Sequence, residues 1–372
     1  MSVKIFVNEL LFGCALLLLS GVGAGQTYAQ QKPPVDVLEG LDPVMLAQGK
    51  ETQGEMNITV TRGKFRYMFA NAANKATFEQ DPARYEIQLE GHCARMGAPT
   101  GGNPDLHTVY QGRIYIFGSE ECKQQFDAAP QSFFEPERKS GVAAATPAEL
   151  KKGQALIEQA VAAMGGAQLV DGLGSYQEKD ATSPQVDFVY MLAFPHQIRK
   201  ESRFGDYRDA AVINRATGET MFIARQDSQP LTEQSRHALS QEINRKPLVI
   251  LRARAQNDFK AAALGPGQAG ETATEQVSVE YGGVAVRLGI EPKTGRVLSV
   301  AYTGRGPSGG FGEVVQTFSD FRAVDGLTAP FKVTSSFNGQ PFPRLTFTVD
   351  SIVINSKLDP ALFAKPATNK AQ

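Results

Sequence analysis

The chain has 372 residues, with 38 Lys and Arg against 39 Asp and Glu and a formal net charge of −1. This length predicts two domains, each large enough for a core of its own. The balanced charge leaves no basic surface for nucleic acid and gives no electrostatic attraction to an anionic lipid surface, so we expect no nucleic-acid partner.

Residues 1–29 have the layout of a secretory signal peptide. Lys4 supplies the positive start, residues 10–22 form a short apolar run, and Ala29 ends a small-residue cleavage site. No later segment is apolar for long enough to span a bilayer. We therefore expect a bacterial protein that is periplasmic or secreted after cleavage near Ala29, and peripheral to a membrane at most.

Residues 30–140 contain a pattern that repeats at a constant spacing. Tyr67, Phe69, Lys75, Phe78 and Pro82 recur 48 residues later as Tyr115, Phe117, Lys123, Phe126 and Pro130. Each copy reads as a glycine turn, a short aromatic strand, a short helix and a proline-ended exit. One such unit cannot bury its own apolar face, so we expect the two copies to pack together as one α+β domain.

Cys93 and Cys122 are the cysteines that remain after cleavage. In an oxidising compartment they are first interpreted as a disulfide, which requires Cα atoms within about 7 Å. With His92 and His107 they also form a candidate zinc or copper site, because thiolate and imidazole suit both metals. Only one of His92 and Cys93 could ligate, since neighbours on a strand face opposite sides. A disulfide, a metal or thiol-redox site, and free buried thiols all stay open.

Residues 141–149 read as a linker and helix cap. Thr146-Pro147-Ala148-Glu149 is a capping box with proline at the first helical position. The helix that follows is expected to end at Gly165-Gly166. One face of it carries Leu150, Leu156, Ile157, Val161 and Met164.

The rest of the chain, to residue 366, reads mainly as antiparallel strand, followed by a tail at 367–372. Alternation over 284–290 predicts a half-buried strand, a turn follows at 292–295, and Asn338-Gly339 predicts a hairpin. The pattern is helical over 230–255 instead. There the side chains Leu248, Ile250 and Leu251 are candidates for one wall of a ligand cavity, with ordinary core packing as the equal alternative.

Signatures of common enzymes are missing. The glycine-rich segment 304–312 lacks the ending of a phosphate loop and leads into a strand, so we interpret it as a hairpin loop. There is no Gly-x-Ser-x-Gly elbow and no His-Glu-x-x-His motif. His196 and His237 have no nucleophile in a recognisable arrangement with them. We therefore expect no catalytic residues and no enzyme.

The repeat domain, residues 30–140, resembles the YHS domain, a small metal-associated module. Its pattern is matched by Phe117, Ser119, Cys122, Phe126, Pro130 and Phe133. Gly118 replaces the first cysteine of that pattern, and the earlier copy has Ala70 and Asn74 at the two cysteine positions. The paired-thiolate ligand of the family is therefore incomplete here.

Residues 150–366 resemble the outer-membrane lipoprotein-sorting (lipoprotein carrier) superfamily. The resemblance lies in Met164-Gly165-Gly166, in residues 318–330 and in residues 353–366. It implies a half-open antiparallel barrel that wraps around helices and encloses an apolar cavity. These motifs are turn and closure signatures, so they bear on the fold more than on a cargo.

The combined prediction is of class α+β: a small duplicated YHS-like α+β domain, then a half-open antiparallel β-barrel with helices in its concave face. The predicted function is an exported, non-enzymatic binding protein whose C-terminal domain holds a lipid or acyl chain and whose YHS-like domain binds a soft metal, zinc or copper. The alternatives are a periplasmic metal-handling or thiol-redox partner that uses Cys93 and Cys122, and an envelope interaction scaffold. The sequence leaves the oligomeric state open.

Overall fold

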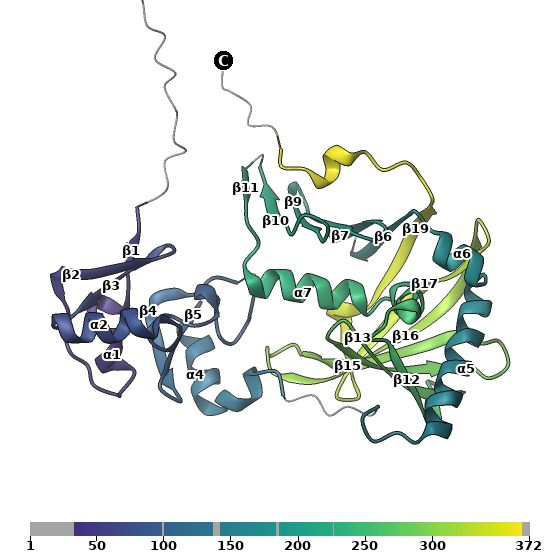
Figure 1. Ribbon diagram of the computed structural model, residues 1–372, viewed down its shortest axis with the longest axis horizontal. Coiled ribbons are helices and arrows are strands. Elements are labelled where there is room, and N and C mark those ends of the chain that lie inside the picture. The colour runs from purple at the N-terminus through teal and green to yellow at the C-terminus, as the bar shows by residue number, and fades with distance from the viewer. Residues whose placement is uncertain (1–32, 99, 137–141, 184–185, 226, 367–372) are drawn as a thin grey trace, which may run out of the picture.

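The computed structural model describes residues 33–98, 100–136, 142–183, 186–225 and 227–366. The expected signal peptide at 1–29 and the tail at 367–372 lie outside these residues. The strands form a three-stranded sheet, a two-stranded sheet and a fourteen-stranded sheet. The two small sheets belong to the first part of the chain, and the large sheet belongs to the second (Figure 1).

The first part of the chain contains two related units, which share a 3₁₀ turn, a hairpin, a helix and a proline-started turn in that order, while β1 and α1 occur in the first unit. The first unit comprises β1 (Val35–Asp36), η1 (Leu38–Gly40), α1 (Pro43–Leu46), β2 (Glu55–Arg62), β3 (Phe65–Phe69), α2 (Ala72–Gln80) and α3 (Pro82–Tyr85). The second comprises η2 (Leu89–Gly91), β4 (Asn103–Tyr110), β5 (Arg113–Phe117), α4 (Glu120–Ala128) and η3 (Pro130–Phe133). In both units a hairpin is followed by a nine-residue helix and a short turn that starts at a proline.

One buried phenylalanine organises each unit. Phe78 of α2 packs against Tyr67 and Phe69, with ring centroids 5.0 and 5.2 Å apart. Phe126 of α4 packs in the same way against Phe117, at 5.1 Å. Both phenylalanines are fully buried, and aromatic contacts of this kind add to the apolar burial. The aromatic positions of the sequence pattern are thus the cores of the two units.

Helix α5 (Pro147–Met164) starts and stops where the sequence predicts. Thr146 accepts from the backbone N–H of Glu149, and the Glu149 carboxylate accepts from the backbone N–H of Thr146. Gly165, with φ 136°, is the C-cap. Four of the five expected apolar residues are buried against the sheet, whereas Leu150 is exposed. Helix α6 (Ala167–Gly172) follows directly.

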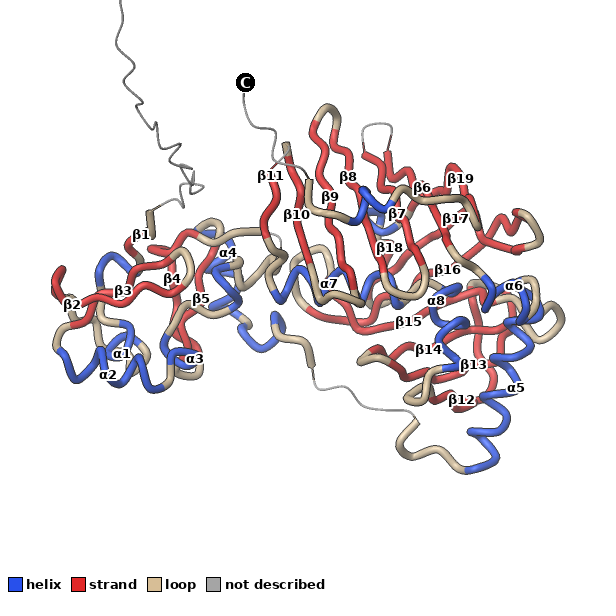
Figure 2. The backbone as a smooth tube through the Cα atoms, turned by 45° about the horizontal axis from the view of Figure 1, so that its top comes forward, coloured by secondary structure: helices blue, strands red, loops and turns tan. Residues whose placement is uncertain are grey.

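The large sheet is antiparallel and open. In spatial order its path runs β11-β10-β9-β8-β7-β6-β19-β17-β16-β15-β14-β13-β12, with β18 paired to β17. Within the described chain, the end strands β11 and β12 do not pair with each other. The sheet curves around helix α7, which lies between its two halves (Figures 1 and 2). The half-open antiparallel architecture is therefore present.

The strands before the central helices are β6 (Ser175–Ser183), β7 (Val186–Ala193), β8 (Gln197–Phe204), β9 (Tyr207–Asn214), β10 (Thr220–Ala224) and β11 (Asp227–Gln229). The strands after them are β12 (Lys260–Ala269), β13 (Thr272–Tyr281), β14 (Val284–Ile290), β15 (Val297–Arg305), β16 (Phe311–Val324), β17 (Leu327–Phe337), β18 (Gln340–Pro341) and β19 (Phe347–Ile354). Short helical turns are η4 (Ala253–Ala255), η5 (Pro343–Leu345) and η6 (Pro360–Phe363).

The helix, hairpin and loop that local sequence patterns predict in this half of the chain are all present. The helical pattern at 230–255 is α7 (Glu233–Asn244) and α8 (Pro247–Arg252). Asn338 and Gly339 have φ 47° and 77° and close the β17–β18 hairpin, as a type I′ turn requires. The glycine-rich segment joins β15 to β16 as a hairpin loop. Among the described residues, no helix is long and apolar enough to cross a membrane.

Candidate functional site

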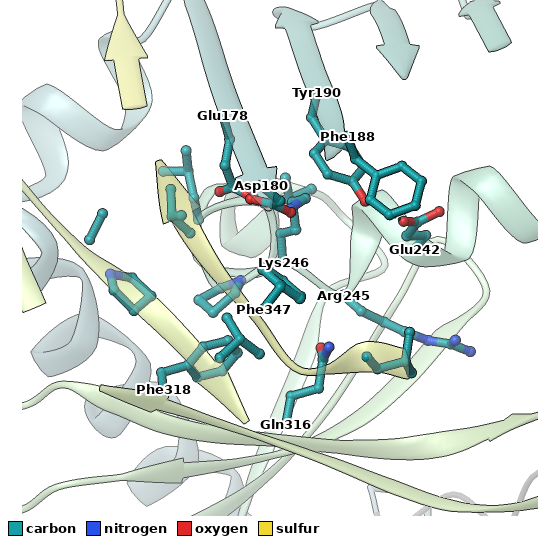
Figure 3. A pocket seen from close by; sticks show the side chains of 18 of the residues that line it. Glu178, Asp180, Phe188, Tyr190, Glu242, Arg245, Lys246, Gln316, Phe318 and Phe347 are labelled. Carbon is teal, nitrogen blue, oxygen red and sulfur yellow. Dashed lines mark hydrogen bonds and ion pairs between the residues drawn. The ribbon is translucent and has the colours of Figure 1, made fainter. Parts of the chain in front are cut away.

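A cavity of about 540 Å³ lies between the concave face of the large sheet and helices α7 and α8. Its volume falls within the usual range of small-molecule sites. Strands β6 and β7 supply one side and β16 supplies the facing side, as Figure 3 shows for the labelled residues. The cavity therefore lies where a curved, unclosed sheet leaves its interior only partly filled.

Most of the wall is apolar. Its aliphatic and aromatic residues include Met164, Phe188, Phe204, Leu248, Val249, Phe318, Leu327, Val333, Leu345, Phe347 and Val349. These side chains come from strands and helices far apart in the sequence. Such a surface favours an apolar ligand, because burying it removes hydrocarbon from water on both sides.

The expected cavity wall is only partly where the sequence analysis put it. Leu248 lines the cavity. Ile250 and Leu251 do not, because both are completely buried in the core. Leu248 and Leu251 lie on nearly the same side of the helix, about 60° apart, so their packing partners decide which of them faces the cavity. The neighbouring Val249 lines the cavity instead.

A buried polar group interrupts the apolar wall. Tyr176, Glu178 and Asp180 alternate along β6 and are 4%, 9% and 1% exposed. All three line the cavity. The Tyr176 hydroxyl and the Lys246 ammonium both donate to the Glu178 carboxylate. Lys246 also lies 3.9 Å from the centroid of the Tyr190 ring, a favourable cation–π position.

A second ion pair lies nearer to solvent. Lys200 Nζ donates to both oxygens of Glu242, at 2.7 and 2.8 Å. The Tyr190 hydroxyl donates to Glu242 Oε1 at 2.6 Å. The side chain of Glu242 is 39% exposed, whereas that of Glu178 is 11% exposed. The polar side of the cavity thus has an inner ion pair, Lys246–Glu178, and an outer ion pair, Lys200–Glu242.

The pKa values of the two inner carboxyl groups, Glu178 and Asp180, are shifted in opposite directions. Burial raises the pKa of Asp180 well above its ordinary value, and the neighbouring Glu178 charge raises it further. Burial also opposes ionisation of Glu178, but Lys246 and the hydrogen bond from Tyr176 outweigh it and hold the pKa of Glu178 below its ordinary value. Of the two inner carboxyl groups, Glu178 therefore ionises at the lower pH, and Asp180 keeps its proton to a higher pH.

Cys93 and Cys122 lie in one small apolar cluster of the second unit. Both are buried free thiols. Arg95 Nη1 lies 3.6 Å from Cys122 Sγ. Burial raises the pKa of Cys122, but hydrogen bonds from Ser119, Arg95 and Cys93 outweigh it and lower that pKa overall. The structure brings the two thiols together without a bond between them.

The two histidines of the expected metal site are elsewhere. His92 Nε2 is hydrogen-bonded to Thr232 Oγ1, at 2.9 Å. His107 is on β4, with Nδ1 3.3 Å from the Asp105 carbonyl oxygen. Across the described residues, no group of three or more His, Cys, Asp or Glu is arranged to hold a metal. The four-ligand zinc or copper site is thus not assembled, because His92 and Cys93 face opposite sides of one extended segment.

The sequence analysis missed Glu178 and Asp180. A signal for them was present, because strict alternation places Tyr176, Glu178 and Asp180 on one face of a strand. Once Tyr176 is assigned to the core, the two acids must follow it inward. Lys246 and Glu242 gave no such signal, since their approach depends on how α7 and α8 pack against β6 and β7.

Three solved structures are similar to part of the chain. A DUF1329 family protein from Desulfovibrio piger is 11% identical and covers 57% of this chain and 96% of its own, with a TM-score of 0.37. A LolA superfamily protein from Nitrosomonas europaea is 12% identical and covers 57% and 97%, with a TM-score of 0.29. MucB is 9% identical and covers 59% and 96%, with a TM-score of 0.19.

Scores and identities this low carry no argument about family or function. No protein-family model matches the chain, and no curated protein matches it. The resemblance to the lipoprotein carriers therefore rests on the sequence motifs.

Proposed function

We propose that this chain is an exported bacterial binding protein, not an enzyme, and that its C-terminal half holds the hydrocarbon part of a lipid or other acyl compound. The observation that carries the proposal is the cavity of about 540 Å³ with its largely aliphatic and aromatic wall. The sequence resemblance to the lipoprotein carrier superfamily supports the same ligand class. Residues 150–366 are the proposed ligand-binding domain, and 30–140 are a separate YHS-like domain.

Apolar burial supplies the binding free energy in this proposal. Each buried methylene contributes up to about 0.8 kcal/mol, which is about a fourfold change in Kd per carbon. Affinity is therefore expected to rise along a series of primary alcohols from six to ten carbons. Isothermal titration calorimetry on purified protein freed of lipid measures this dependence directly. An affinity that does not change with chain length would contradict the proposal.

A blocked cavity provides the matched control. Val249 lines the cavity and is only partly buried, so Val249→Trp fills the space with little disturbance of the core. This variant is expected to lose binding of the ten-carbon alcohol. Val353→Trp changes an exposed valine of β19 that does not line the cavity, and it is expected to bind normally. Native mass spectrometry of the gently purified protein then identifies what the cavity carries from the cell.

A thiol-redox role of the N-terminal part is a second candidate. One observation favours it: two free thiols share a buried cluster, and Arg95 lies beside one of them. Thiol titration of the unfolded protein, with and without prior reduction, tests this role. If protein purified from an oxidising compartment shows two reactive thiols both with and without prior reduction, the thiols are not oxidised there, and the role is contradicted.

A further inference from the structure

One oxygen of the cavity wall has no hydrogen-bond partner. Asp180 is 1% exposed and lines the cavity, and within the described part of the chain nothing donates to its Oδ1 atom. A buried polar atom without a partner is costly. A ligand in the cavity that brings a hydrogen-bond donor to Asp180 would supply the missing partner. Asp180 is therefore the candidate contact for the polar end of a ligand.

The ammonium groups near Asp180 are already engaged. Lys246 is paired with Glu178, and Lys200 donates to both oxygens of Glu242. These two cations line the same cavity as three carboxyl groups, those of Glu178, Asp180 and Glu242. Figure 3 shows Lys246 with the three acids. An anionic head group would have to displace a carboxylate from a lysine or lie beside Asp180 without a cation of its own, and either arrangement is unfavourable in a poorly solvated space.

Two further cations line the cavity away from Asp180. Arg245, at the C-terminal end of α7, donates to Gln241 Oε1 and to the Thr303 carbonyl oxygen and lies 4.2 Å from the centroid of the Tyr302 ring. Arg344 belongs to the short turn η5 and is exposed. The Arg245 side chain points away from Glu178 and Asp180 (Figure 3), so a carboxylate head that met it would lie away from β6.

We propose that the cavity prefers amphiphiles whose head group donates a hydrogen bond, an alcohol or an amine, over those with a carboxylate, and that Asp180 receives this donor. The inference rests on the proposed function, because the hydrocarbon tail fills the apolar wall. Asp180 holds its proton in a hydrogen bond to Glu178, so Oδ1 remains an acceptor for an alcohol. A neutral amine takes up the proton of Asp180, and the carboxylate then pairs with the resulting ammonium.

Three probes with the same ten-carbon chain length distinguish the effect of the head group from that of the tail. They are decan-1-ol, decylamine and decanoate. Calorimetric titration of the wild-type protein at neutral pH is expected to give affinities about tenfold or more higher for the alcohol and the amine than for decanoate, the range of a hydrogen bond made or left unmade. Decanoate binding as tightly as the other two would overturn the inference and leave the proposed function standing. If none of the three binds, the proposed function fails as well.

Substitutions at Asp180 assign the preference to this residue. Asp180→Leu is expected to bring the three affinities to within about threefold of one another, because the acceptor is gone. Asp180→Asn keeps a carbonyl oxygen, so it is expected to retain the alcohol and to lose the amine. Asp350→Asn removes a carboxylate of β19 that does not line the cavity and is expected to leave all three affinities unchanged. A preference that persists in Asp180→Leu would overturn the assignment.

Discussion

At the scale of single residues, the polar side of the cavity depends on Lys246. Its ammonium lies between Glu178 and the Tyr190 ring, with 16% of the side chain exposed. Burial disfavours the charge of Lys246, but the ion pair with Glu178 outweighs this effect and raises the pKa of Lys246. A buried charge of this kind is tolerated only while its partner is present.

Lys246→Met is therefore expected to destabilise the protein by about 3–5 kcal/mol, because Glu178 would be left as an uncompensated buried charge. Urea unfolding monitored by circular dichroism measures the change. The matched control is Arg287→Met, which breaks an ion pair between Arg287 and Glu313. These two side chains are 44% and 52% exposed, and the expected cost is below about 1 kcal/mol. Equal losses in the two variants would contradict this account of Lys246.

The proton on Asp180 predicts a pH-dependent stability difference between the wild type and Asp180→Asn. Burial and Glu178 raise the pKa of Asp180 in the folded state, so the unfolded chain releases this proton at a lower pH than the folded one. The wild type should therefore lose stability relative to the amide variant as the pH rises above about 4, by at most about 1.4 kcal/mol per pH unit.

This loss should end once the pH passes the folded-state pKa of Asp180. Glu178, Glu242, Lys200 and Lys246 face the same space in both proteins, so their own titration largely cancels in the difference. Urea unfolding of both proteins between pH 4 and 8 provides the measurement. A difference that is constant over this range would mean that Asp180 is ionised in the folded protein.

At the scale of elements, α5 approaches the large sheet through a glycine. A Cβ atom at Gly153 would lie 2.6 Å from the Ala261 carbonyl oxygen of β12. Helix propensity alone predicts that Gly153→Ala stabilises the protein by about 1 kcal/mol. The close approach predicts the opposite, a loss of about 1–3 kcal/mol, because the helix must move away from the strand.

Thermal unfolding followed by circular dichroism decides between these two expectations. Gly172 is the last residue of α6, and a Cβ atom there would meet nothing within 4 Å, so Gly172→Ala should change the melting temperature little. A gain in stability for Gly153→Ala would show that the contact between α5 and β12 is less close than described.

Elements with local signals were predictable from the sequence. The capping box at Thr146, the hairpin at Asn338-Gly339 and the helical segment at 230–255 each depend on neighbouring residues, and all three are present. The cavity wall was predictable only in part. Leu248 and Leu251 are both apolar and lie three residues apart, and only their packing partners decide which one faces the open space.

At the scale of the whole molecule, the N-terminal units contact α7, the helix that carries Glu242 of the cavity wall. The Glu90 carboxylate accepts from the backbone N–H groups of Glu233 and Gln234, at 3.0 and 3.2 Å. These are the first residues of α7, and a carboxylate at a helix N-terminus is stabilising. Arg305 Nη1 donates to the Arg95 carbonyl oxygen at 3.0 Å. No pattern in the sequence predicts such contacts, because each joins segments far apart in the chain.

Glu90→Ala is expected to increase amide hydrogen exchange in the first turn of α7, since two backbone N–H groups lose their acceptor. Hydrogen–deuterium exchange with mass spectrometry reads this segment directly. Glu39 occupies the same place in the first unit, with φ 53° against 52° for Glu90, and has no contact with α7 among its hydrogen bonds in the described chain. Glu39→Ala should leave exchange in α7 unchanged, and equal effects of both variants would contradict a specific cap.

The most direct test of the central claim, that hydrocarbon enters the space between the sheet and α7–α8, uses a single tryptophan. The chain contains none, so Phe347→Trp places the sole indole in the cavity wall and Tyr85→Trp places one in the N-terminal part as a control. Titration with decan-1-ol should shift the emission of Phe347→Trp to shorter wavelength and saturate at one equivalent, with no change in Tyr85→Trp. An emission spectrum of Phe347→Trp that does not respond, or that responds without saturating, would contradict the claim.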